Sequence, residues 1–251
     1  MNIDLSNKTV LITGASGDLG QATTKALSNA NARCLLVGRS EERLQQTIPK
    51  TAKDKTHLYI VDLTQPNQIS SMLDTLEYHV DIVVHCAAPL FQYTKIHQLT
   101  QEQIDIQYQV GINSLMQICS ILLPKMMFQG WGRIVCAGSL AGAVSGKGSA
   151  PYSLVKAAQE SYMRSIALEY GRYHICANTL RIGPLDGARL KKRDEEYPGA
   201  RQKMMNKVPT KRLPTPNQVA DIIAFFCSSY IEPVNGATLD VSSAAHLNLG
   251  W

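Results

Sequence analysis

The run Lys8-Thr-Val-Leu-Ile-Thr-Gly14 leads directly into Ala15-Ser-Gly17-Asp-Leu-Gly20. The first part is short and β-branched, which predicts a buried strand. The second is rich in glycine and precedes Gln21-Ala-Thr-Thr-Lys-Ala-Leu27, which favours a helix. Glycines in such a turn let the backbone approach a pyrophosphate, and the helix N-terminus attracts its charge. A tight turn without a ligand is the alternative, but its place after the first strand favours a dinucleotide site.

Short apolar runs alternate with helical segments along the whole chain. The expected strands are Thr9–Thr13, Arg33–Val37, His57–Val61, Ile82–His85, Arg133–Cys136, Ile175–Leu180 and Thr238–Val241. Helices are expected between them, notably over about Gln101–Phe128 and Pro151–Arg172. This alternation predicts an α/β fold: a single-domain, Rossmann-like, doubly wound parallel sheet of about seven strands with helices on both faces. We expect one domain over 1–251, with a cofactor half at about 1–130 and a catalytic and substrate half at about 131–251.

The composition is that of a soluble globular enzyme, with 45% hydrophobic and 18% charged residues. No run of the sequence approaches membrane-spanning length, and Met1-Asn-Ile-Asp-Leu5 does not resemble a signal peptide. We therefore expect a cytoplasmic protein that does not enter a membrane. The six cysteines form no C-x-x-C pair and lie mostly in apolar segments, which indicates reduced core residues and no metal site.

Tyr152 and Lys156 stand four residues apart on an expected helix, and Ser139 lies thirteen residues before the tyrosine. Positions i and i+4 share a helix face, so the Lys156 ammonium lies near the Tyr152 phenol and stabilises its phenolate form. Such a phenol can protonate a carbonyl oxygen while a hydride reaches the carbonyl carbon, and Ser139 can hold that oxygen. An exposed helical Tyr and Lys is the alternative for the pair alone, but Ser139 and the glycine-rich turn favour catalysis.

Together these motifs resemble the short-chain dehydrogenase/reductase family over essentially the full length, and most nearly its 3-oxoacyl-acyl-carrier-protein reductases. Asn235-Gly-Ala-Thr-Leu-Asp-Val241 resembles the family's final strand region. The resemblance implies a catalytic trio of Ser139, Tyr152 and Lys156. It also implies that the residues contacting the nicotinamide cofactor are Gly14, Ser16, Gly17, Asp18, Leu19, Gly20, Arg39, Asp62, Leu63, Ala87, Tyr152, Lys156, Gly183 and Leu185.

The end of the second strand, Leu35-Leu-Val-Gly38-Arg39, bears on which nicotinamide cofactor is used. Gly38 stands where NAD-dependent members of the family have an acid, and the planar fork of Arg39 can bind a 2′-phosphate. NADP (NADPH) is therefore expected, with a solvated surface arginine as the alternative. Asp18 puts a negative charge at the pyrophosphate end, unless it caps the following helix. Asp62 resembles the family's adenine-contacting acid, and a helix cap is its alternative role.

Some positions depart from the family pattern. Gly111 occupies the place of the helix asparagine that supports the active-site lysine through a water, and Asn113 faces nearly the opposite way on a regular helix. An asparagine restored at 111 is expected to raise turnover, unless the glycine makes room for a bulky neighbour such as His85 or a wide substrate. The other departures are His85-Cys-Ala-Ala88, Ile182-Gly183, Gly187 and Ser242-Ser-Ala244. His85 is expected to be buried with its hydrogen bonds satisfied, or else to be an extra hydrogen-bonding group near the nicotinamide.

The segment Arg181–Arg212 is expected to contain the substrate lid, and it carries ten Lys and Arg against four Asp and Glu. Such a patch can attract an acidic acyl carrier protein or coenzyme A, although a solvated lid helix is equally consistent with it. Nucleic-acid binding is not expected. The leading hypothesis is an NADPH-dependent ketoreductase acting on a 3-oxoacyl thioester in fatty-acid or polyketide-type synthesis. The alternatives are an enzyme acting on a small free ketone or alcohol, and a low-turnover partner subunit. The resemblance also implies a homotetramer.

Overall fold

The computed structural model of the chain describes residues 3–89 and 93–247, so Met1 and Asn2 of the N-terminal segment discussed above lie outside it. Its centre is one sheet of seven parallel strands in the spatial order β3-β2-β1-β4-β5-β6-β7. The strands are β1 (Thr9–Thr13), β2 (Arg33–Gly38), β3 (Thr56–Ile60), β4 (Ile82–His85), β5 (Gly132–Ser139), β6 (Ile175–Ile182) and β7 (Thr238–Val241). The predicted fold class is confirmed, and no strand end differs from its predicted position by more than three residues.

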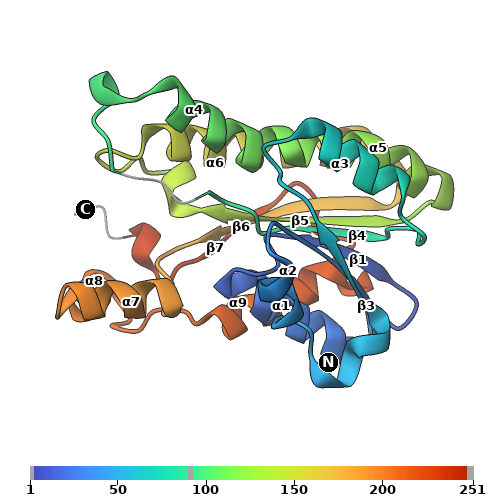
Figure 1. The fold of residues 1–251 in the computed structure, drawn as a ribbon, viewed down its shortest axis with the longest axis horizontal. Coiled ribbons are helices and arrows are strands. Elements are labelled where there is room, and N and C mark those ends of the chain that lie inside the picture. The colour runs from blue at the N-terminus through green and yellow to red at the C-terminus, as the bar shows by residue number, and fades with distance from the viewer. Residues whose placement is uncertain (1–2, 90–92, 248–251) are drawn as a thin grey trace.

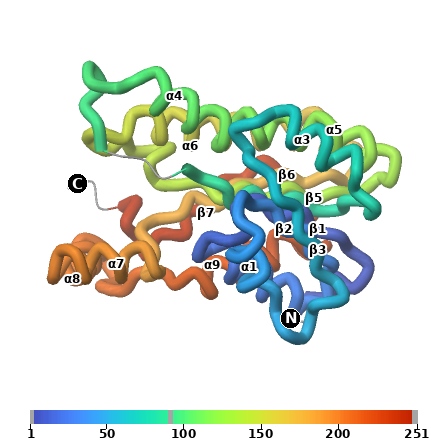
Figure 2. Tube along the Cα trace, in the orientation of Figure 1, coloured from blue at the N-terminus to red at the C-terminus, as the bar shows by residue number. Residues whose placement is uncertain are grey.

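Helices cover both faces of the sheet (Figure 1). One layer contains α1 (Asp18–Asn29), α2 (Glu41–Gln45) and α9 (Pro216–Cys227), and α1 packs directly on α9. The other contains α3 (Pro66–Asp74), α4 (Gln101–Tyr108), α5 (Ser114–Gln129) and α6 (Ala150–Tyr170). The short helices α7 (Ala188–Glu196) and α8 (Ala200–Lys207) follow β6 and extend to the same side of the molecule as α4 (Figure 2).

The hydrophobic core consists of two large clusters of buried side chains. One joins β1 and β2 to α1 and α9 and contains Val10, Leu27 and Ile223. The other joins the opposite side of the sheet to α3, α5 and α6 and contains Leu11, Leu122 and Ile166. All six cysteines are free, and all except Cys86 are fully buried, as the sequence predicts.

The predicted helix Gln101–Phe128 is interrupted: a π-helical turn, Gln109–Asn113, separates α4 from α5. Such turns widen a helix by one residue and occur often at functional sites. Taken as one element, Gln101–Gln129 has 29 residues and is long and apolar enough to cross a membrane by length and composition, contrary to our expectation for the sequence. Half of its most apolar window is buried inside the protein, and Leu115, Ile118 and Leu122 of this stretch belong to the core. We therefore interpret it as a core helix.

Candidate active site

The order of the strands reverses beside β1, which pairs with β2 on one side and β4 on the other. In doubly wound sheets, ligands bind outside the carboxyl ends of the strands at such a reversal. The glycine-rich turn after β1 and the end of β4 lie at this edge, and β5 ends there at Ser139. The fold therefore brings the predicted cofactor turn and the predicted catalytic segment to one edge of the sheet.

Tyr152 and Lys156 lie in the first two turns of α6 on one face, with the Lys156 Nζ atom 5.7 Å from the centre of the Tyr152 ring. Ser139 is half-buried at the end of β5, and its hydroxyl oxygen accepts a hydrogen bond of 3.2 Å from the Ala141 amide. The turn after Ser139 packs against α6 so closely that a Cβ atom at Gly142 would lie 3.0 Å from the carbonyl carbon of Lys156. The helix with Tyr152 and Lys156 is thus fixed against the segment that carries Ser139.

The Lys156 side chain is 3% exposed, and its ammonium contacts two oxygen atoms. It donates hydrogen bonds to the Ala137 carbonyl at 2.7 Å and to Oε1 of Gln159 at 3.0 Å. The Nε2 atom of Gln159 donates in turn to the Gly111 carbonyl at 2.6 Å. A continuous hydrogen-bonded chain therefore links the lysine to the π-helical turn. Asn113, considered above as a substitute, is exposed.

His85 lies at the end of β4 and is fully buried. Its Nδ1 atom lies 2.9 Å from the Thr13 hydroxyl, while Nε2 is buried without a hydrogen bond to any described residue. Burial, followed by repulsion from the Lys156 ammonium, lowers the pKa of His85 to about 3. The histidine is thus buried and neutral, as the sequence favours, but only one ring nitrogen is clearly satisfied.

Glu160 follows Gln159 and belongs to a different network. Its carboxylate receives two hydrogen bonds from Arg181, of 2.8 and 2.9 Å, and Arg181 also contacts Asp240 at 3.2 Å. Hydrogen bonds from Arg181 to Glu160, and then the charges of both acids, raise the arginine pKa. These contacts connect the catalytic helix α6 to β6 and β7. Arg181 therefore lies in β6, which continues through it to Ile182, and its charge belongs to this network.

The turn between β1 and α1 has the close packing that a dinucleotide cradle requires. Gly14 has a φ of +65°, and a Cβ atom there would lie 2.7 Å from the Ala87 Cα. A Cβ at Gly20 would lie 2.3 Å from the Gly14 carbonyl oxygen. The N-cap residue of α1 is Gly17, and no side chain caps this helix. The first backbone N–H groups of α1 can therefore donate hydrogen bonds to an anion, and the residues of this turn fit the phosphates of a dinucleotide.

Asp18 does not cap α1, contrary to one of the roles expected for it. It is the first residue of the helix, and Oδ2 of its side chain accepts a hydrogen bond of 3.3 Å from the Arg189 amide at the start of α7. A Cβ atom at Gly187 would lie 2.6 Å from the same carboxylate oxygen. The acid therefore bridges the glycine-rich turn and the α7–α8 segment. Glycine at position 187 leaves room for this carboxylate.

Two arginines lie near the end of β2. Arg39 is exposed, as expected for a residue that meets a ligand from solvent. Arg43, on α2, donates a hydrogen bond of 3.1 Å from Nη2 to the Ser16 carbonyl in the glycine-rich turn. This contact joins α2 to the cofactor turn and places a second cation there, which sequence reasoning missed.

The remaining predicted cofactor residues lie on neighbouring loops. Asp62 follows β3, and Oδ1 accepts from the Thr64 amide at 3.0 Å, while Gln65 is the N-cap of α3, so Asp62 is not that helix's cap. Leu63 and Ala87 are buried. Gly183 packs so closely that its Cβ would lie 2.8 Å from the Ser242 Cβ, and Leu185 is half-buried on the next turn.

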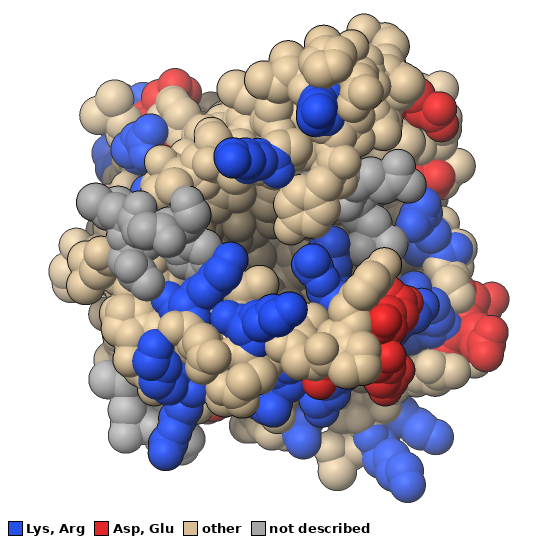
Figure 3. Space-filling view, turned by 90° about the vertical axis from the view of Figure 1, so that its left-hand side faces the viewer, with Lys and Arg blue, Asp and Glu red and all other residues tan. Residues whose placement is uncertain are grey.

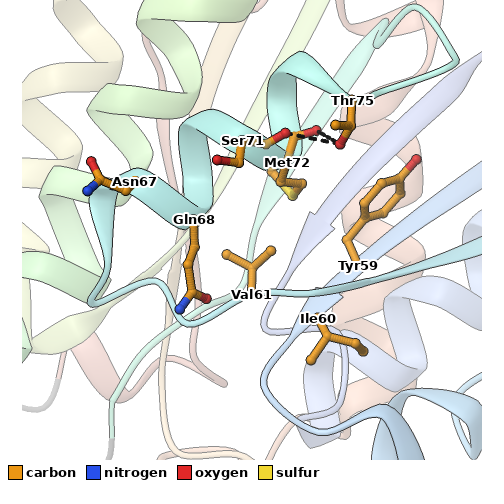
Figure 4. Close-up of a pocket in the computed structure, with 8 residues that line it drawn as sticks. All are labelled: Tyr59, Ile60, Val61, Asn67, Gln68, Ser71, Met72 and Thr75. Atoms are coloured by element: carbon orange, nitrogen blue, oxygen red, sulfur yellow. Dashed lines mark hydrogen bonds between the residues drawn. The ribbon is translucent and has the colours of Figure 1, made fainter.

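A cavity of about 480 Å³ lies between the first turns of α4 and the start of α6. Its lining includes Tyr152, Gln103, Gln107 and Ser149. The Gln107 side chain is 4% exposed, and its Oε1 atom is buried without a hydrogen bond to any residue within 3–89 and 93–247. A second cavity, of about 440 Å³, runs along the outer edge strand β3 and helix α3 (Figure 4). Its lining contains none of the predicted catalytic residues.

Lys and Arg gather around and below a hollow on the face shown in Figure 3. Without Arg181, the α7–α8 segment from 182 to 212 retains nine Lys and Arg against four Asp and Glu. Arg201 is held by Asp186 through a short ion pair. The exposed cations of this segment are Arg189, Lys191, Lys192, Arg193, Lys203, Lys207, Lys211 and Arg212.

A family model described as enoyl-(acyl carrier protein) reductase matches residues 14–245, most of the chain. The chain belongs to the short-chain dehydrogenase/reductase family. The predicted resemblance is thus confirmed, and this member is an NAD(P)-dependent oxidoreductase acting on CH–OH or C=O groups.

Curated relatives of this short-chain dehydrogenase/reductase include two 3-oxoacyl-[acyl-carrier-protein] reductases. The one from Rickettsia bellii is 27% identical over 96% of the chain and 97% of the relative. The one from Pseudomonas aeruginosa is 25% identical over 98% of the chain and 100% of the relative.

Solved structures show the same fold. A 3-oxoacyl (acyl-carrier-protein) reductase from Agrobacterium tumefaciens with NADP bound has a TM-score of 0.91 at 23% identity, covering 97% of this chain and 96% of that one. L-sorbose reductase from Gluconobacter frateurii, complexed with NADPH and L-sorbose, has a TM-score of 0.90 at 21% identity, covering 99% and 100% of the two chains.

Several residues of the site escaped sequence reasoning. The sequence did contain one indication of Gln159 and Glu160, because residues three and four positions after Lys156 share its helix face and both are polar. Gln107 carried a similar signal, four residues before Gly111. The partners of these side chains lie on distant segments, so the sequence alone does not identify their contacts.

Proposed function

We propose that the protein is an NADPH-dependent ketoreductase that reduces a 3-oxoacyl thioester carried by an acyl carrier protein or coenzyme A. The observation that carries this proposal is the placement of Tyr152 and the hydrogen-bonded Lys156 against the strand that ends at Ser139, at the same sheet edge as the uncapped start of α1. When bound, the nicotinamide cofactor supplies the hydride. The cationic segment of α7 and α8 suits an acidic carrier or a phosphorylated substrate.

In this proposal each side chain of the trio has one task. Tyr152 donates the proton to the carbonyl oxygen as the general acid. Lys156 stabilises the phenolate that remains, and Ser139 donates a hydrogen bond to the substrate oxygen. Arg39 binds the 2′-phosphate, assisted by Arg43, whose position is fixed by the Ser16 carbonyl.

The test is consumption of NADPH by the purified protein with acyl-carrier-protein and coenzyme A thioesters of 3-oxo acids, compared with free ketones. Faster turnover of the thioesters supports the proposal. No oxidation of NADPH or NADH with any carbonyl, and no reduction of NADP or NAD with alcohols, contradicts it and favours a low-turnover partner subunit.

A second candidate function is reduction of a small free carbonyl compound that carries a hydroxyl group. The observation favouring it is Gln107, which lines the cavity beside Tyr152 and whose buried Oε1 atom has no hydrogen bond to any described residue. A buried amide oxygen without a donor costs free energy, and a substrate hydroxyl would recover it. Replacement by leucine should then lower kcat/KM for hydroxyketones while leaving that for unsubstituted ketones within threefold.

We further propose that the protein is a cytoplasmic homotetramer. Apolar side chains are exposed along the helices of one face: Met116 and Phe128 on α5, and Leu154 and Leu168 on α6. Burial of this face between copies of the chain accounts for their exposure. Sedimentation at micromolar concentration is expected to give the tetramer, and a monomer contradicts it.

A further inference from the structure

The Lys156 ammonium is buried without an ion-pair partner among the described residues. The ionisable groups close enough to interact electrostatically with it include His85 from β4, Cys86 after it, Cys136 from β5 and Tyr152 from α6. The histidine is neutral, and burial raises the thiol pKa of Cys86 to about 12 and that of Cys136 to about 11. Glu160, the nearest acid along α6, is held by Arg181. Neutral oxygen atoms must therefore support the charge.

Only two such atoms contact the ammonium in the described part of the chain, the Ala137 carbonyl and Oε1 of Gln159. The orientation of the Gln159 amide follows from chemistry. Lysine can only donate and the Gly111 carbonyl can only accept, so the glutamine must turn its oxygen to Lys156 and its nitrogen to Gly111. Gln159 is itself 0% exposed, and both ends of the amide are used. Glutamine does both without gaining or losing a proton, whereas a glutamate of the same length can donate only when it is protonated.

The partner at the far end is equally well defined. Gly111 lies within the π-helical turn, and its carbonyl accepts the Gln159 hydrogen bond at 2.6 Å. The turn is fixed between α4 and α5, while α6 carries both Lys156 and Gln159. The amide therefore connects the lysine to the π-helical turn through two direct hydrogen bonds.

We propose that Gln159 is a positioning residue that fixes the Lys156 ammonium beneath Tyr152 by bridging it to the Gly111 carbonyl. Gln159 acts on turnover through Lys156 and Tyr152, so its role in catalysis rests on the proposed reduction.

Two substitutions separate positioning from packing. Gln159→Glu keeps the length of the side chain and the acceptor for Lys156, but an ionised carboxylate cannot donate to Gly111 and partly neutralises the ammonium. The phenolate of Tyr152 is then less stabilised, so the pH at which kcat/KM for reduction falls on the alkaline side should rise by about one unit or more. Gln159→Met keeps the volume and removes both hydrogen bonds. It should lower kcat roughly tenfold or more, with KM for the carbonyl substrate within about threefold.

The matched control is Gln117→Met on α5. Gln117 also donates to a backbone carbonyl, that of Pro66, at 2.8 Å, and it holds α3 to α5 away from Lys156. This variant should lower the melting temperature without moving the pH profile or kcat. The proposal is overturned if kcat/KM of Gln159→Glu falls at the same alkaline pH as that of the wild type. It is also overturned if a folded Gln159→Met has a kcat within threefold of wild type.

A measurement on the unaltered protein needs neither folding of a variant nor a substrate. In ¹⁵N-labelled full-length protein, the side-chain amide protons of Gln159 should exchange with water far more slowly than those of the exposed Gln202. Fast exchange at Gln159 overturns the bridge. Slow exchange in a protein that reduces no carbonyl leaves the bridge standing and removes the proposed function instead.

Discussion

A Cβ atom at Gly111 would lie 2.3 Å from Cγ1 of Val155, a buried residue of the catalytic helix α6. This is far inside normal contact distance, and a β-branched side chain has little rotational freedom with which to move aside. The bulky neighbour that a side chain at position 111 would meet first is therefore Val155. Glycine at 111 lets α6 approach the π-helical turn closely enough for Gln159 to reach the Gly111 carbonyl.

We accordingly expect Gly111→Asn to lower both the melting temperature and kcat, in place of the rise in turnover considered from the sequence. Overpacking of this kind costs about 1–3 kcal/mol of the free energy of unfolding. Adding Val155→Ala should recover part of the loss, which a double-mutant cycle of denaturant unfolding measures. A stable Gly111→Asn protein with a higher kcat contradicts this account.

Tyr152→Phe should lower the rate of carbonyl reduction by about 100- to 10,000-fold, because the phenol donates the proton. Cofactor affinity should change little, since the ring is retained. Fluorescence titration with the cofactor and steady-state kinetics measure the two effects separately. Activity within threefold of wild type removes Tyr152 from its assigned role.

NADPH should be preferred over NADH, and Arg39→Ala should weaken that preference. A charge-assisted contact to the 2′-phosphate contributes about 1.5–3 kcal/mol, or roughly 10- to 150-fold in kcat/KM for NADPH. Arg43→Ala should act in the same direction and also remove the hydrogen bond to the Ser16 carbonyl. Arg39→Lys, which keeps the charge without the planar fork, is the control and should have an intermediate effect. Equal kcat/KM for the two cofactors in the wild type contradicts the assignment.

Ala244→Gly should raise the free energy of unfolding by roughly 1 kcal/mol or slightly less. Ala244 has a φ of +63° and Ser243 a φ of +53°, in the left-handed region that favours glycine. An L-residue pays about 1–2 kcal/mol in this region, partly offset by the greater chain entropy of glycine in the unfolded state. The neighbouring Ala245→Gly is the control. Ala245 is fully buried, so its replacement by glycine should lower the free energy of unfolding.

The strands were predictable because each is a short apolar run and a parallel sheet buries both of its faces. The trio and the glycine-rich turn were predictable because the spacing of these residues along the chain already indicates which of them act together. The Gln159 bridge was not, since Gln159 and Gly111 are 48 residues apart and meet only across a π-helical turn. The ion pairs of Arg181 were not predictable for the same reason: Asp240, 59 residues further along, becomes its neighbour only when β6 pairs with β7.

The stability of the protein should fall in mild acid because of His85, whose pKa is lowered from 6.5 to about 3 by burial and by Lys156. Above about pH 6.5 the ring is neutral in both the folded and the unfolded chain, so His85 does not make the free energy of unfolding depend on pH there. Between about pH 6.5 and 3 the unfolded chain binds a proton that the folded protein does not. The free energy of unfolding therefore falls as the pH is lowered, by at most about 1.4 kcal/mol per pH unit.

His85→Asn removes this proton uptake, so its loss of stability between pH 6.5 and 4.5 should be smaller than that of the wild type. Urea unfolding at several pH values measures the slope directly. His97→Asn is the control, because His97 is exposed and its replacement should leave the slope unchanged. If His85→Asn and wild type lose stability in parallel over this range, the ring accepts a proton in the folded protein and His85 is not held neutral beside Lys156.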